Sequence, residues 1–213
     1  MLPKLLCEKL CSLNPGVDRL AYSVFFRMER STGKLVEDFK PVFKRTVIRS
    51  CAKWDYQLVQ DIIDKKLTDL SQIDENCRPS NGVAFSDLVT DCLVLNELAQ
   101  NRRQIRFQQG SFLLYNLEFV FRLDKDTHMP LSFQESTMIQ SKNLIEEFML
   151  LTNILVAEFV RPHCQDKTLL RAHQDIPADR KVTLNQFFET IGLGDRIDLT
   201  NSTTLSHSLE ALN

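Results

Sequence analysis

The sequence is organised around the stretch Lys142-Asn143-Leu144-Ile145-Glu146-Glu147-Phe148-Met149-Leu150-Leu151-Thr152-Asn153. Residues 148–160 are apolar on almost every side of a helix, which predicts a central helix buried among other elements. At 100° per residue Glu146 and Asn153 fall on one side of this helix, and Asn143 lies next to them. Because buried polar groups must be hydrogen-bonded, this polar line is either a structural network or a contact to a ligand.

Length and composition predict a globular domain of ordinary kind. The chain has 213 residues, of which 43% are hydrophobic and 25% charged, and its formal net charge is −2. This charge gives no general attraction to nucleic acid, so any RNA contact would have to be local. Neither a membrane-spanning run nor a signal peptide is recognisable, and we therefore expect a cytoplasmic protein without a membrane partner.

Short strand patterns and helical patterns flank the central helix. Residues 20–28 alternate with period two, and the chain returns after a turn at 31–34 as a second strand, which predicts an antiparallel pair. Asp55 is a good N-cap for the helix that follows. The pattern as a whole predicts an α+β fold, in which antiparallel hairpins pack with the long central buried helix. The expected elements are helices at 3–13, 55–66, 85–107, 142–162, 183–191 and from 202 onward, and strands at 20–28, 42–53, 117–123 and 130–133.

Two groups of residues are candidates for ligand contacts. Tyr56 lies in the first turn of its predicted helix, where its hydroxyl can face a cleft and where a helix N-terminus favours phosphate; the alternative is a tyrosine packing at the helix rim. Arg102, Arg103 and Arg106 cluster near the end of the long helix. They either complement the helix dipole or contact phosphate.

The residues alone indicate no catalytic motif. The six glycines have neither GxGxxG nor GxxxxGK spacing, the six cysteines are scattered without a CxxC pair, and no GxSxG or HExxH pattern occurs. Glu146 and Glu147 are adjacent, so on a helix they diverge by about 100° and cannot face each other as an acid and a base. What remains is an α+β domain with one polar line and local arginine clusters.

Several stretches, taken together, resemble the RNB exoribonuclease family, which includes bacterial ribonucleases II and R. The similarity is greatest to the eukaryotic cytoplasmic branch, the Dis3-like exonucleases. In order and spacing the matching stretches cover nearly the whole chain, and as a set they are specific. The matching residues lie at 1–3, 6–8, 10–15, 18–24, 45–53, 56, 106–107, 110, 143–151 and 153.

The resemblance implies an activity and roles for individual residues. Members of this family hydrolyse single-stranded RNA from its 3′ end to nucleoside monophosphates, with Mg²⁺ held by clustered aspartates. By position, Tyr56 would lie against the terminal nucleotide beside the scissile phosphate. Glu146 would bond the ribose 2′-hydroxyl, which distinguishes RNA from DNA. Basic residues are candidates for contacts to the RNA backbone, namely Arg45, Arg49, Arg102, Arg103 and Arg106.

The resemblance also implies that parts of the family's active site lie elsewhere. The metal-binding aspartates of the family fall upstream of the segment that Met1 matches, and an arginine that contacts the scissile phosphate falls beyond Asn213. We therefore expect residues 1–213 to be a partial RNB catalytic domain truncated at both ends, inactive alone and binding no metal, from a typically monomeric family. The alternative is a non-catalytic RNA-binding or interaction module derived from an RNB domain.

Overall fold

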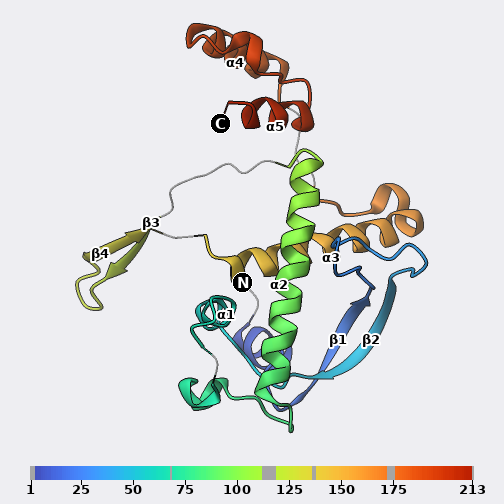
Figure 1. Ribbon diagram of the computed structural model, residues 1–213, viewed down its shortest axis with the longest axis vertical. Helices are drawn as coiled ribbons and strands as arrows, with labels where there is room; N and C mark the ends of the chain where they lie inside the picture. The colour runs from blue at the N-terminus through green and yellow to red at the C-terminus, as the bar shows by residue number, and fades with distance from the viewer. Residues whose placement is uncertain (1–2, 68, 112–118, 136–137, 172–175, 213) are drawn as a thin grey trace. The chain divides into compact units, whose positions relative to one another are not determined.

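The computed structural model describes residues 3–67, 69–111, 119–135, 138–171 and 176–212, and it confirms the α+β class (Figure 1). Contacts within the chain divide it into two compact units. The first contains residues 1–102 and 138–162, and the second contains residues 103–137 and 163–213. No Pro-, Gly- or Ser-rich linker in the sequence marks this division.

The strand pair of the first unit is formed by β1 (Asp18–Phe25) and β2 (Val42–Arg49), which are antiparallel. The second strand therefore ends at residue 49, before the expected residue 53. On one face of the pair, the hydroxyls of Ser23 and Thr46 are hydrogen-bonded at 2.7 Å. On the other face Leu20 is 84% exposed, so the apolar face that the alternation predicts is open rather than buried.

Helix α1 (Tyr56–Ile63) begins where the sequence predicts. The Asp55 carboxylate accepts the backbone N–H of Leu58 at 2.8 Å, which satisfies one of the unpaired donors of the first turn. Before the cap, the indole N–H of Trp54 donates to the carbonyl oxygen of Cys77 at 2.7 Å. The cap and the indole thus fix the direction in which the chain enters α1.

Two long helices run through the chain, α2 (Phe85–Gln108) and α3 (Gln140–Cys164). The residues of α3 that are buried recur every three to four positions, so they form a single stripe. The stripe is made by Ser141, Leu144, Glu147, Leu151 and Leu155. This helix is the long helical element that the sequence predicts, and its buried surface is this stripe.

Two details of the prediction for α3 are wrong. Met149 is 59% exposed and Ile154 46%, so the helix is not buried on almost every side, because apolar composition alone does not say which faces find a partner. The helix also continues through Pro162 instead of ending before it. This proline lies in the last turn, where its missing N–H costs only one backbone hydrogen bond.

The second unit contains the hairpin of β3 (Phe119–Leu123) and β4 (Pro130–Glu135), the helix α4 (Ala178–Thr190) and the helix α5 (Ser202–Glu210). The side chain of Asn201 caps α5 by accepting the backbone N–H of Thr204 at 2.9 Å.

Short helical turns occur in both units. They are η1 (Leu5–Leu10), η2 (Leu70–Gln72), η3 (Glu75–Cys77), η4 (Gln165–Lys167) and η5 (Gly194–Arg196).

Among the residues that the structure describes, no helix is both long enough and apolar enough to span a bilayer.

Candidate nucleic-acid interface

Hydrogen bonds from Ser141 join the start of α3 to the first turns of α1. Its hydroxyl donates to the carbonyl oxygen of Tyr56 at 2.7 Å, and its backbone N–H donates to the Oε1 atom of Gln60 at 3.1 Å. Ser141 is 1% exposed and Gln60 is 9% exposed, so the bond to Gln60 is buried, and the bond to the carbonyl oxygen of Tyr56 is partly buried. The amide nitrogen of Gln60 in turn donates to the carboxylate of Asp64 at 2.8 Å. The two helices are therefore fixed to each other in the region of Tyr56.

The backbone of Tyr56 is held while its side chain is open. The residue is 47% exposed, and it is the first residue of α1, directly after the Asp55 cap. An exposed ring on a fixed backbone can stack on a base or a ribose without reorganising the protein. The position is therefore compatible with the predicted contact to a terminal nucleotide.

The two adjacent glutamates of α3 have different surroundings. Glu147 belongs to the buried stripe and is 2% exposed, whereas Glu146 is only half-buried. At 100° per residue Glu146 lies about 160° round the helix from the middle of that stripe. The polar line of Glu146 and Asn153 therefore runs on the side away from the stripe, where a ligand can reach it. Glu147, like Ser141, is a buried polar residue of α3, which agrees with a structural role for Glu147 rather than a contact to a ligand.

Asn143 lies three residues before Glu146. Its side-chain oxygen is buried and accepts no hydrogen bond from the part of the chain that the structure describes. A buried acceptor without a donor is destabilising, so this atom marks a place where the local hydrogen bonding is incomplete.

The two arginines of β2 differ in their partners. Arg49 forms an ion pair with Asp18 at 2.7 Å, and both side chains are more than half exposed, so this pair contributes little to stability. Arg45 is exposed, and within the described ranges its guanidinium has neither a hydrogen bond nor an ion pair. Of these two candidates for contacts to an RNA backbone, Arg45 is the one whose guanidinium is available to bind a phosphate.

The three arginines of α2 are half-buried. The guanidinium carbons of Arg103 and Arg106 lie 5.0 Å and 5.2 Å from the centre of the Phe107 ring, within the range of cation–π attraction. Gly33 packs closely against the backbone of α2 at Arg102. A Cβ atom added at Gly33 would lie 2.8 Å from the backbone nitrogen of Arg102. Arg106 lies in the last turn of α2, where it complements the helix dipole, and a phosphate contact of the three arginines stays a prediction.

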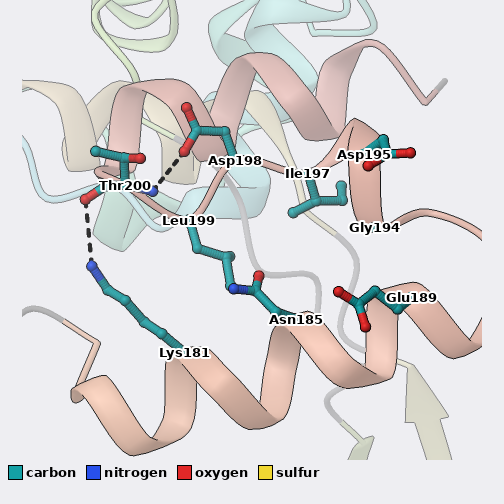
Figure 2. A pocket seen from close by; sticks show the side chains of 9 residues that line it. All are labelled: Lys181, Asn185, Glu189, Gly194, Asp195, Ile197, Asp198, Leu199 and Thr200. Carbon is teal, nitrogen blue, oxygen red and sulfur yellow. Dashed lines mark hydrogen bonds between the residues drawn. The ribbon is translucent and has the colours of Figure 1, made fainter.

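A polar pocket of about 490 Å³ lies in the second unit between α4 and the segment after η5 (Figure 2). Lys181, on α4, donates to the carbonyl oxygen of Thr200 at 3.5 Å, and the backbone N–H of Thr200 donates to Asp198 at 2.8 Å. Hydrogen bonds from the side chain and then the backbone of Thr200 lower the pKa of Asp198. Glu189 and Asp195 add two further carboxylates to the wall, so the pocket carries more negative than positive charge and repels phosphate. No pattern in the sequence indicates this pocket, because polar residues at helical spacing are common on any helix face that is exposed to solvent.

A site for Mg²⁺ requires several oxygen donors close together. In the portion of the chain with described coordinates, no three His, Cys, Asp or Glu side chains are grouped so that they could hold a metal ion. The residues that the structure describes therefore do not fit a magnesium centre.

The α+β fold is that of an RNB domain, and the chain belongs to the RNB domain family, whose profile matches residues 1–213. It is 39% identical to DIS3-like exonuclease 2 of Schizosaccharomyces pombe over 88% of this chain and 19% of that protein. Two Arabidopsis thaliana proteins, DIS3-like exonuclease 2 and inactive exonuclease DIS3L2, are each 36% identical over 100% of this chain and 19% of their own lengths. The Dis3-like branch expected from the sequence is thereby confirmed.

The solved structure of Mycoplasma genitalium RNase R in complex with ribose methylated single-stranded RNA has the same fold. It matches with a TM-score of 0.77 at 19% identity, over 99% of this chain and 30% of that one. At this identity the likeness establishes the fold alone. The chain spans about a fifth of the length of the relatives named above.

Proposed function

We propose that this chain binds single-stranded RNA as part of a 3′-to-5′ exoribonuclease that releases nucleoside monophosphates. The family membership supports the proposal, because relatives that match nearly the whole chain are named exonucleases. The matching RNase R structure contains single-stranded RNA, which supports RNA as the ligand.

The observation that carries the proposal is the joint of α1 and α3. Ser141 fixes the backbone of Tyr56, and Glu146 follows five residues further along α3, a rise of about 7.5 Å along the helix axis. An exposed ring and an accessible carboxylate are thus presented by two helices that cannot move independently. A ring can stack on the terminal nucleotide, and a carboxylate can accept the hydrogen bond of a ribose 2′-hydroxyl.

Finer points of the proposal are that the complete enzyme uses Mg²⁺, works in the cytoplasm and is a monomer. Support for Mg²⁺ comes from the RNB family as a whole and not from residues described here. Under this proposal the 213-residue chain recognises RNA, and cleavage depends on acidic residues that other parts of an RNB protein provide.

A non-catalytic RNA-binding or interaction module is the second candidate. One specific observation favours it: the chain is equally similar, at 36% identity, to an Arabidopsis protein named an exonuclease and to one named inactive. Similarity over this segment is therefore compatible both with a part of an active exonuclease and with a non-catalytic module.

Binding and cleavage by the purified 213-residue chain test the two candidates. We expect a fluorescein-labelled oligouridine to bind more tightly than a blunt RNA duplex, and we expect Tyr56→Ala to weaken binding about tenfold, since stacking on one base contributes on the order of 1–3 kcal/mol. Gln57→Ala, the neighbouring exposed residue of α1, is the matched control. Equal affinity for duplex and single strand, or an unchanged affinity for Tyr56→Ala, would overturn the proposal. Release of mononucleotides by this chain alone in the presence of Mg²⁺ would contradict both candidates, because each of them leaves cleavage to residues outside the chain.

A further inference from the structure

The open face of the β1–β2 pair combines an aromatic ring, aliphatic side chains and a charge. Tyr22 lies opposite Arg45 in the strand register, and Leu20 lies opposite Val47. Tyr22 is 65% exposed, and the two aliphatic residues are 84% and 64% exposed. These four residues, here called the Tyr22 face, point to one side because alternate residues of a strand share a face.

The Tyr22 face is closed at one end and open along the rest. At the closed end Phe43 stacks on Phe159 of α3, with ring centres 4.1 Å apart. At the far end of the strands Arg49 is paired with Asp18, so its charge is compensated. The uncompensated charge of the face is therefore that of Arg45, in the middle of β2.

The charge of Arg45 decides which kind of partner fits this surface. An apolar protein segment laid over the face would bury a guanidinium without a counter-charge, which is unfavourable. A single-stranded nucleic acid has both complements, since its phosphates neutralise Arg45 and its bases stack on the ring of Tyr22 and contact the aliphatic side chains. Charge complementarity therefore favours RNA over an apolar protein segment.

We infer that the Tyr22 face is a second contact surface for single-stranded RNA, on which Tyr22 stacks a base while Arg45 binds an adjacent phosphate. The inference rests on the proposed function, because it takes single-stranded RNA as the ligand of this chain. It adds a surface on the strands to the residues of α1 and α3, so the RNA that the chain holds extends beyond its terminal nucleotide.

Fluorescence anisotropy with labelled oligouridine tests the inference on the 213-residue chain. Tyr22→Ala weakens binding about tenfold, whereas Tyr22→Phe keeps the ring and binds within about twofold of the wild type. Arg45→Gln weakens binding and reduces the slope of log affinity against log salt concentration by about one. Lys44→Gln, which removes the same charge from the neighbouring exposed residue on the opposite face, leaves the slope nearly unchanged.

Photocrosslinking tests the inference on the wild-type chain, so it does not require a variant to fold. Oligouridine carrying 4-thiouridine, irradiated with the wild-type chain and digested for mass spectrometry, labels the peptide that contains Tyr22. Absence of this crosslink, together with unchanged affinity of Tyr22→Ala, overturns the inference while the proposed function stands. A wild-type chain that binds no single-stranded RNA overturns both. A concentration-dependent dimer in sedimentation that Tyr22→Ala abolishes would show that the face joins two copies of the chain, and would also overturn the inference.

Discussion

The hydroxyl of Ser141 donates to the carbonyl oxygen of Tyr56 at 2.7 Å, across 85 positions of sequence. This bond replaces the water that the carbonyl would otherwise bind, and it lies at the joint where α3 meets α1. Because the same residue also binds Gln60 through its backbone, α1 is fixed at two consecutive turns. The proposed contact of Tyr56 with RNA therefore depends on a residue that itself touches no ligand.

Ser141→Ala is expected to lower the free energy of unfolding by about 1–2 kcal/mol, because the carbonyl of Tyr56 loses a buried donor. Ser86→Ala, at an exposed position of α2, is expected to change it by less than about 0.5 kcal/mol. Urea titrations followed by circular dichroism measure both. Equal midpoints for the two variants would show that the bond contributes nothing to stability.

Gly110 and Gly192 form a matched pair of substitutions in the second unit. Both have a left-handed backbone, with φ of +92° and +75°, but a Cβ at Gly110 would lie 2.6 Å from the Cα atom of Thr203, whereas one at Gly192 meets nothing within 4 Å. Alanine at either position carries the cost of the left-handed conformation, and Gly110→Ala adds a clash with backbone. Its destabilisation should exceed that of Gly192→Ala by about 1–3 kcal/mol in thermal unfolding. Indistinguishable melting temperatures would contradict the close packing of Gly110 on Thr203.

The pH dependence of stability should report on Asp198. Hydrogen bonds from Thr200, first through its side chain and then through its backbone, lower the pKa of this carboxyl below its ordinary value of 3.8. A lowered pKa in the folded state means that the stabilising contribution is present above the ordinary value and is lost as the pH falls through the folded one. Asp198→Asn should therefore be less stable than the wild type at about pH 6, and the difference should shrink as the pH falls below the ordinary pKa of the carboxyl. A difference that stays constant over this range would show that the charge of Asp198 is not what stabilises the segment after η5.

Local signals in the sequence predict much of the fold. The start of α1 follows from Asp55, because an N-cap acts on the next three residues and needs no tertiary contact. The α2 helix and both hairpins follow from periodicity, since the polar and apolar spacing of a strand or a helix is set by its own geometry. The RNB family follows from several motifs in order, each of which is short.

The surroundings of the elements could not be predicted in the same way. Period-two alternation places Leu20 and Tyr22 on one face but does not say whether anything covers that face. The contact of Ser141 with Tyr56 joins distant parts of the sequence, so no local pattern contains it. The burial of Glu147, in contrast, can be predicted from helical periodicity, because Glu147 falls on the same stripe as Leu144 and Leu151.

The central claim is that Glu146 recognises the ribose 2′-hydroxyl of a bound RNA. Its most direct test is the ratio of affinities for oligouridine and oligodeoxyuridine, measured by anisotropy in the presence of a chelator for the wild-type chain and for Glu146→Ala. Glu158→Ala, an exposed glutamate on the same helix, is the control with the same change of charge. We expect the wild-type chain and the control to prefer RNA, and Glu146→Ala to lose about tenfold or more of that preference, as a hydrogen bond to a charged group contributes on the order of 1.5–3 kcal/mol. An RNA preference that is the same in all three proteins would contradict the account.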